Sequence, residues 1–174
     1  AYAGATYFEK AEESYQKLID LEGSNINAWI NLAETYLRQG KLNEAKGLLE
    51  TAVTNLSDPQ LNNMLSQTEA IPPVFSHVSG SYADYFLLEL ESAIPGSTVY
   101  FSTDGSEPEI SAANAYLDGI VISRPQTQVK AKTVNQLGFE SETVVLNFVI
   151  ERAPELVRID DYQLRNILMQ QVGA

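Results

Sequence analysis

A spacing of 34 residues near the start of the chain constrains its fold more than any other feature. Ala11 and Ala45 lie at this offset in similar surroundings, and the same offset relates Tyr15 to Leu49. A repeat of this length with helical periodicity is typical of stacked helix pairs, because neither helix of a pair can bury its apolar stripe alone. The first part of the chain is therefore predicted to form helical repeats, a shape that favours holding a partner.

Residues 26–56 contain two apolar stripes with helical spacing, separated by a break at Gly40. The stripes consist of Trp29, Leu32, Ala33 and Tyr36, and then of Ala45, Leu49 and Ala52. The pattern resembles the tetratricopeptide repeat, with Ala at the position of the usual small Gly and Leu at that of the usual Phe. The resemblance implies antiparallel helix pairs in which the first helix of each pair lines a concave face.

The helical pattern extends to both sides of this unit. Residues 7–21 are predicted to be the second helix of a preceding unit, whose first helix is missing or reduced to residues 1–5. A last helix is expected to begin at Asp58-Pro59, with Asp58 as N-cap, and to run to about Thr68, resembling the cap of such arrays. The chain starts without Met and without a signal-peptide pattern. Because repeat-like sequence begins almost at once and a helical pattern runs to the last residues, we expect a fragment of a longer protein.

The periodicity changes at Ile71-Pro72-Pro73, because a residue before proline is driven out of the α region. From there, apolar residues alternate with more polar ones, as in half-buried strands, and turn-forming residues separate the segments. The alternating segments are residues 86–90, 99–101, 129–131 and 144–150. Short strands without helical stretches between them predict an antiparallel β-sandwich of roughly 80 residues.

One part of this region carries a more specific string. It reads Pro95-Gly96-x-x-Val99-x-Phe101-x-Thr103-Asp104-Gly105-Ser106-x-Pro108. Asp104 is expected to accept a hydrogen bond from the backbone amide two residues on, and Gly105 to take a positive φ. Together with Gly80-Ser81-Tyr82 and Val129-Lys130-Ala131-Lys132, the string resembles the chitobiase/β-hexosaminidase C-terminal domain, a fibronectin-III-like sandwich. The resemblance implies an accessory module, since the catalytic barrel of such glycosidases lies elsewhere and its catalytic residues have no counterpart here.

The predicted fold is therefore multidomain, α then β. Tetratricopeptide-like antiparallel helical repeats with a capping helix are assigned to residues 1–70. An immunoglobulin- or fibronectin-III-like antiparallel β-sandwich is assigned to residues 71–151. Residues 152–174 form a tail with a short apolar stripe, which suits either a helix docked on one module or the beginning of a further domain.

Composition narrows the classes of partner. The hydrophobic share of 44% and the charged share of 20% are those of a globular protein. The net charge of −12 would repel phosphate backbones and anionic lipid head groups, so nucleic acid and direct membrane contact are poor partner hypotheses. The chain has no Cys, which excludes disulfides and thiolate metal sites. It also lacks an apolar run long enough to span a bilayer.

Few residues suggest catalysis or metal binding. His77 is the only histidine, so a histidine-based zinc cluster is excluded and a structural or exposed role is predicted. Glu89 and Glu91 could serve as the acid and nucleophile of a glycosidase, but alternation with leucines favours the solvent face of a strand. A calcium loop would draw on Asp104, Glu107, Glu109 and Asp118, although their spacing lacks the EF-hand pattern. No catalytic residue, metal or cofactor is predicted.

The helix over residues 26–38 has one face that the core leaves free. Its positions are Asn27, Ile30, Asn31, Glu34, Leu37 and Arg38. Asn31 matches an asparagine that is frequent in the tetratricopeptide family and can hold an extended peptide by its backbone. The resemblance therefore implies that Asn27, Ile30, Asn31, Glu34 and Arg38 contact a peptide or protein. The alternative is that they are solvated or buried against the next module.

Tyrosines are numerous in the predicted sandwich. Aromatic rings can stack on the apolar face of a sugar, and the candidates for such contact are Tyr82, Tyr85, Tyr100 and Tyr116. Tyrosine is also a common strand former, so a structural role is the alternative.

The function predicted from these features is a non-catalytic interaction or scaffold segment with a spacer, in a larger bacterial protein at the cell surface or anchored in a membrane. This hypothesis rests on the resemblance to two families with structural or interaction roles, and on the lack of a catalytic constellation in the sequence. The alternative is a carbohydrate-binding accessory module that recognises cell-wall or chitin-like glycans. A weaker third hypothesis is a fragment of an enzyme whose active site lies outside this sequence.

Overall fold

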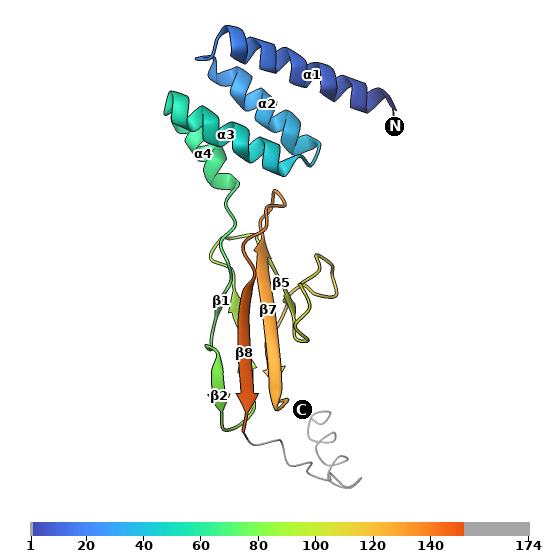
Figure 1. The fold of residues 1–174 in the computed structure, drawn as a ribbon, viewed down its shortest axis with the longest axis vertical. Helices are drawn as coiled ribbons and strands as arrows, with labels where there is room; N and C mark the ends of the chain where they lie inside the picture. Colours follow the sequence, from blue (N-terminus) through green and yellow to red (C-terminus); the bar gives the residue numbers. More distant parts are fainter. Residues whose placement is uncertain (1, 152–174) are drawn as a thin grey trace, which may run out of the picture.

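The computed structural model describes residues 2–151 of the 174, with side chains from Tyr7 onward. The chain forms a stack of helices followed by a β-sandwich, arranged along one long axis (Figure 1). The predicted fold class, helical repeats followed by a β-sandwich, is confirmed, although one strand pair of the sandwich is parallel. The tail predicted over residues 152–174 lies outside the described residues. Within the described part, no helix is both long enough and apolar enough to span a bilayer.

Four helices form the first module, and neighbouring helices in the chain pack on one another. They are α1 (Tyr2–Leu21), α2 (Ile26–Arg38), α3 (Leu42–Leu56) and α4 (Pro59–Gln67). The sequence predicted a start at residue 7 for α1, but the helix includes residues 2–6. The sequence left two alternatives for the first helix of the preceding unit, absence or a remnant over residues 1–5. Because residues 2–5 belong to α1, the remnant is wrong.

The ends of the helices follow from side-chain capping and backbone freedom. Asp58 Oδ1 accepts hydrogen bonds from the amides of Gln60 (2.8 Å) and Leu61 (3.3 Å), and Pro59 is the first residue of α4. Gly40 has a φ of 72°, which the turn after α2 requires and which residues with a Cβ rarely adopt. The N-cap and the glycine break were both predicted from the sequence and are confirmed.

The helical core is built around one indole and several small residues. Trp29 is buried, and its Nε1 donates a hydrogen bond to the Gly23 carbonyl at 2.9 Å. Small side chains at the crossing points let the helices approach closely. The buried residues of this cluster are Ile19, Ala28, Trp29, Leu32, Ala33, Leu49, Ala52 and Leu61.

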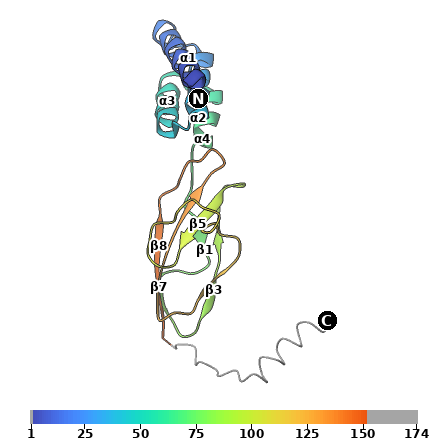
Figure 2. The same cartoon turned by 90° about the vertical axis from the view of Figure 1, so that its right-hand side faces the viewer.

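Eight short strands form the second module. They are β1 (Val74–Phe75), β2 (Gly80–Tyr82), β3 (Phe86–Leu88), β4 (Leu90–Glu91), β5 (Thr98–Ser102), β6 (Ile120–Ile122), β7 (Gln126–Val134) and β8 (Val144–Ile150). One layer is a four-stranded sheet in the order β2-β8-β7-β5, and the pairs β1-β4 and β3-β6 provide further strands. Figure 2 shows β7 and β8 on one side of the sandwich and β3 on the other.

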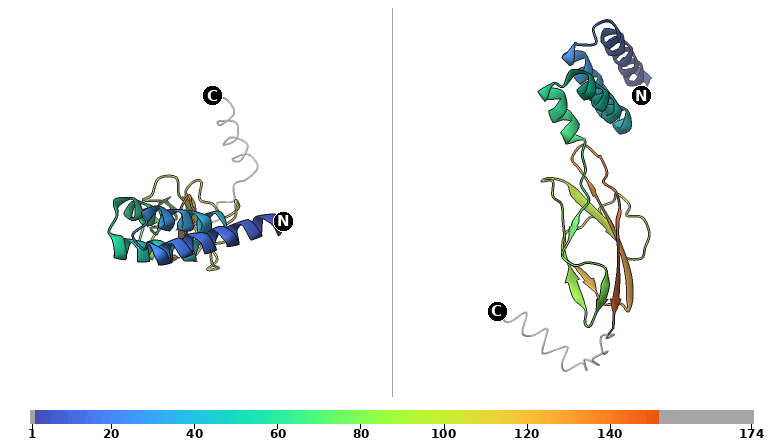
Figure 3. Two further views of the ribbon diagram at one scale, coloured as in Figure 1. Left: turned by 90° about the horizontal axis from the view of Figure 1, so that it is seen from above. Right: turned by 60° about the vertical axis from the view of Figure 1, so that its left-hand side comes forward.

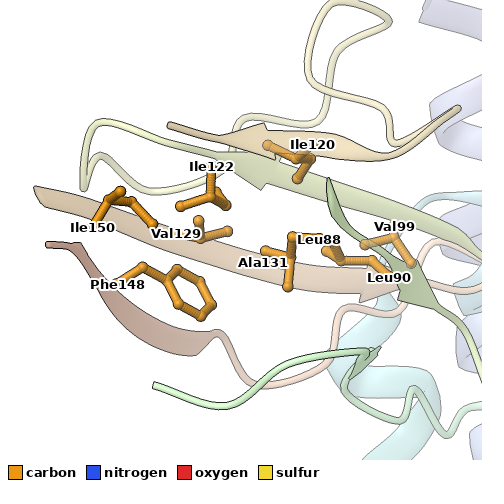
Figure 4. Packing of buried hydrophobic residues seen from close by; sticks show 9 residues of the cluster. All are labelled: Leu88, Leu90, Val99, Ile120, Ile122, Val129, Ala131, Phe148 and Ile150. Carbon is orange, nitrogen blue, oxygen red and sulfur yellow. The ribbon is translucent and has the colours of Figure 1, made fainter. Parts of the chain in front are cut away.

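The core lies between these layers, and Figure 4 shows apolar side chains converging there. In β7, Val129 and Ala131 are buried, whereas Lys130 and Lys132 lie on the outer face and are only half-buried, as the alternation predicted. The buried cluster consists of Leu88, Leu90, Val99, Ile120, Ile122, Val129, Ala131, Phe148 and Ile150.

Strand pairing differs from the prediction in two places. β2 runs parallel to β8, with Tyr82 opposite Ile150, so the sandwich is not purely antiparallel. The segment 86–90, predicted as one strand, changes partner at Glu89: β3 pairs with β6, and β4 pairs with β1. At the change, the Glu89 amide donates to Ser76 Oγ and the Ser76 amide to the Glu89 carbonyl, each at 2.9 Å. Alternation predicts which face a side chain takes, but not the strand that pairs with it.

Candidate functional site

A hollow of about 190 Å³ lies between α1 and α2. It brings three residues of the predicted concave face, Asn31, Glu34 and Arg38, together with an aromatic surface from α1. The complete lining is Tyr7, Phe8, Ala11, Tyr15, Asn31, Glu34, Thr35 and Arg38.

Helical spacing explains this arrangement. Asn31, Glu34 and Arg38 follow one another at intervals of three and four residues, so they share one stripe of α2. The opposite stripe, which contains Trp29, is buried in the helical core. Ala11 has too small a side chain to fill the space between the rings that flank it on α1. The hollow is therefore a consequence of where the two stripes place large and small side chains.

The floor of the hollow is held by a local hydrogen bond. Thr35 is buried, and its Oγ1 donates to the Asn31 carbonyl at 2.7 Å, which satisfies the hydroxyl without using the Asn31 carboxamide. That carboxamide carries N–H donors and a carbonyl acceptor, which complement the C=O and the N–H of a peptide unit. The site can therefore read a peptide unit by direct hydrogen bonds.

The rim combines aromatic rings with a weak ion pair. Tyr7 is 74% exposed, and its ring meets Phe8 edge to face with 6.3 Å between centroids. Arg38 and Glu34 lie 3.7 Å apart, with 72% and 49% of their side chains exposed. Exposed pairs of this kind contribute little stability, so either charge is available to a ligand. The site offers an apolar contact and both signs of charge within one hollow.

The two remaining residues of the predicted face lie elsewhere. Asn27 is exposed near the start of α2, and Ile30 is half-buried against the helical core. Neither is among the residues that line the hollow. The role of all five residues in binding stays a prediction.

Sequence reasoning missed the contribution of α1. Tyr7, Phe8 and Tyr15 were assigned only to a helix that packs on its neighbour, but they also line the hollow. One sequence feature could have indicated this hollow: the small Ala11 of the repeat lies between aromatic residues on the same helix.

An ion pair beside the hollow connects α1 to the turn after α2. Glu12 Oε1 accepts hydrogen bonds from Lys41 Nζ at 2.6 Å and from Gln39 Nε2 at 2.5 Å. The hydrogen bond from Lys41 lowers the pKa of Glu12, and the same bond raises the pKa of Lys41. These contacts connect α1 to the end of α2 on the surface of the helical module.

The structure does not bring the four candidate tyrosines onto one surface. Tyr82 and Tyr116 pack against the sandwich core, and the Tyr82 hydroxyl donates to the Val78 carbonyl at 2.8 Å. Tyr100 is half-buried on the outer face of β5, opposite Lys132, whereas Tyr85 is exposed beyond β2. Two of the four rings are thus engaged in packing.

Two acidic residues of the suggested calcium loop, Asp104 and Glu107, accept hydrogen bonds from neighbouring protein groups. Asp104 Oδ1 accepts from the Ser106 hydroxyl (2.6 Å) and amide (2.9 Å), and these bonds lower the pKa of Asp104. Gly105 has a φ of 83°, so the predicted turn is confirmed. A hydrogen bond from Lys130 lowers the pKa of Glu107. Within residues 2–151, no three side chains of the His, Cys, Asp or Glu type come together as metal ligands would.

The residues considered for catalysis lie on the sandwich and its surface. His77 stacks on Phe86, with 4.2 Å between ring centroids, and its Nδ1 lies 2.9 Å from Ser76 Oγ. The Ser76 hydroxyl also accepts a hydrogen bond from the Glu89 amide, between β3 and β4. Glu89 and Glu91 are both exposed.

Comparison with known proteins identifies both modules. Residues 5–67 match the family model of the tetratricopeptide repeat, and residues 78–145 match that of the chitobiase/β-hexosaminidase C-terminal domain. Tetratricopeptide repeats generally mediate protein–protein interaction, and the second domain is a module of glycosidases; neither is a catalytic domain. No curated protein and no solved structure matches the chain. The chain therefore joins a segment of the tetratricopeptide repeat family to a domain of the chitobiase/β-hexosaminidase C-terminal family.

Proposed function

We propose that the helical module binds an extended segment of a partner protein in the hollow between α1 and α2. The β-sandwich acts as a spacer that carries this module, within a larger protein at a bacterial cell surface or anchored in a membrane. The observation that supports binding is the convergence of Asn31, an aromatic rim and a loosely paired Arg38 in one hollow.

The size of the hollow favours a side chain over a small molecule. Sites for drug-sized ligands usually measure about 300–1,000 Å³. The hollow measures 190 Å³, which suits one apolar or aromatic side chain of a peptide. Asn31 beside it would hold the peptide backbone, and the rings of Tyr7 and Phe8 would cover the inserted side chain. Such a ligand would use both the carboxamide and the aromatic rings of the hollow.

The distribution of polar contacts supports a binding role for the helical module and a structural role for the sandwich. In the sandwich, the carboxylates of Asp104 and Glu107 hold a turn and a neighbouring strand. In the helical module, the Asn31 carboxamide and the Arg38 guanidinium lie at the hollow. The groups suited to reading a ligand therefore belong to the helices.

Binding can be tested with a displayed library of random peptides selected on the immobilised full chain. We expect enriched peptides to share an apolar or aromatic position. Their affinity should fall at least tenfold with Asn31→Ala, because the buried peptide group would lose its hydrogen bonds. Arg38→Ala should weaken binding of those peptides that carry an acidic residue.

Matched controls separate binding from folding. Asn63→Ala and Lys17→Ala alter exposed residues of the same types, amide and cation, away from the hollow. Both should bind as the unaltered chain does, and all four variants should keep its melting temperature. Equal affinity of the selected peptides for Asn31→Ala and the unaltered chain, or no enrichment at all, would contradict the proposal.

A further inference from the structure

We infer that the hairpin between β7 and β8, residues 135–143, docks on the helical module and holds the two modules in one fixed orientation, with Asn135 as the positioning residue. The connecting residues 68–73 contain Pro72 and Pro73, which stiffen the chain locally. A stiff linker limits bending but does not by itself fix the angle between the helical module and the sandwich. The angle needs a contact between the modules, and Figure 3 shows this hairpin reaching toward the helices where α4 leads into the sandwich.

Asn135 provides that contact through both sides of its carboxamide. Its Nδ2 donates to the carbonyls of Gln67 (3.0 Å) and Glu69 (2.9 Å) at the end of the helical module. Its Oδ1 accepts from the amides of Leu137 (2.9 Å) and Phe139 (3.0 Å) within the hairpin. The hairpin amides thus orient the carboxamide through its oxygen, and its nitrogen bonds to the end of the helical module.

The position of these bonds explains why they are effective. Gln67 is the last residue of α4, and the last carbonyls of a helix have no donor within the helix. Asn135 supplies a donor to one of them, although it lies 68 residues further along the chain. Because Asn135 is only 9% exposed, water has little access to replace its bonds.

Packing adds a second restraint on the angle. Phe139 and Thr68 are buried beside Asn135, and a Cβ built on Gly138 would lie 3.4 Å from Leu42 Cδ1 at the start of α3. Gly138 has a φ of 92°, so the hairpin turns tightly against that helix. The hairpin therefore touches the beginning of α3 and the end of α4.

The contact between the modules is narrow. Open hollows of 670 and 210 Å³ lie at the joint, and residues of both modules line each of them. Within the described residues, Asn135 makes the only side-chain hydrogen bonds between the hairpin and the helical module. Because the contact is narrow and depends on one buried carboxamide, we expect a single substitution at Asn135 to make the relative orientation of the two modules variable.

The inference can be tested by measuring distances between spin labels on the full chain. The chain has no Cys, so labels can be attached only where cysteines are introduced. Lys17→Cys on α1 and Ser81→Cys on β2 place labels at exposed positions on the two modules. We expect one narrow distance distribution for this pair in the otherwise unaltered chain. A broad distribution in that chain would overturn the inference.

Asn135→Asp is the decisive variant. A carboxylate still accepts from Leu137 and Phe139, but it cannot donate to Gln67 and Glu69, and it places a negative charge beside their carbonyls. We expect the distance distribution to become at least twice as wide. Gln136→Ala, a change at the exposed neighbouring residue, should leave it narrow. An unchanged width for Asn135→Asp would overturn the inference.

A second label pair shows that any broadening comes from the joint. Ser81→Cys with Glu109→Cys lies within the sandwich, and both positions are exposed. This pair should report the same distance with and without Asn135→Asp. Broadening within the sandwich would mean that Asn135 supports only its own module, and that outcome also contradicts the inference. Because no ligand is involved, the result is independent of the proposed binding function.

Discussion

The helical module and the sandwich are stabilised in different ways. Each helix packs on its neighbour in the chain, and small residues such as Ala33 and Ala52 permit the close approach. The sandwich instead joins segments far apart in sequence, such as β2 and β8, around larger side chains like Phe148. A stack of neighbours leaves faces open to a partner, whereas a sandwich encloses its side chains between two layers. This difference supports placing the proposed binding site on the helices and the proposed spacer role on the strands.

The largest effect that tests this comparison is expected from Trp29→Ala. Removing a buried indole should cost about 3–5 kcal/mol of unfolding free energy. The loss should appear as a lower melting temperature of the helical circular-dichroism signal. Hydrogen exchange of β7 should stay slow, because the sandwich core contains no residue from the helices. Loss of protection in both modules together would show that they unfold as one unit.

Leu88→Ala is the reciprocal change in the sandwich. Leu88 is fully buried, and its truncation should cost about 2–5 kcal/mol through lost burial and the cavity left behind. Hydrogen exchange should accelerate in β3, β6 and β7 but not in α2. Leu87→Ala is the matched control, because Leu87 is 48% exposed on the outer face of the same strand. Equal destabilisation by both changes would contradict the assigned core.

Gly105→Ala tests the turn that the sequence string predicts. The φ of 83° is unfavourable for a residue with a Cβ, and an added Cβ would lie 2.7 Å from Gln128 Oε1. We expect a loss of about 1–2 kcal/mol, measured by urea unfolding. Gly47→Ala in α3 offers a control, since nothing lies within 4 Å of a Cβ there, and it should be neutral or stabilising. An equally stable Gly105→Ala chain would rule out the strain.

The smallest expected effect is the pH dependence at Asp104. Hydrogen bonds from Ser106 lower the folded-state pKa of Asp104 below the usual 3.8. Its ionised form therefore adds stability above that pH, and this contribution is lost as the pH falls through the folded-state pKa. Asp104→Asn should lose slightly less stability than the unaltered chain between pH 7 and pH 3, measured by urea midpoints. An identical loss would show that the turn does not depend on the charge.

Local features of the fold were predictable because they depend on neighbours in the chain. The N-cap at Asp58, the positive φ of Gly40 and the turn at Asp104 each arise within a few residues. The buried alternation of Val129 and Ala131 is likewise a local pattern. Such features need no information about distant segments, so their residue types are sufficient.

The candidate site was only partly predictable. The stripe of Asn31, Glu34 and Arg38 follows from helical periodicity, but the aromatic rim depends on how α1 crosses α2. Ile30 was assigned to the free face, yet it packs against the helical core. Periodicity gives the direction of a side chain around its own helix, whereas the crossing angle decides what it meets.

The amino-acid sequence by itself determined two modules, their order, their resemblance to known families and most of the residues that face each core, because apolar periodicity and turn residues act over short distances. Only the tertiary structure decided that β2 pairs with β8, that α1 completes the hollow, and that Asn135 bonds to the end of α4. These are contacts between segments far apart in the chain. They depend on the simultaneous packing of many side chains, which no local pattern encodes.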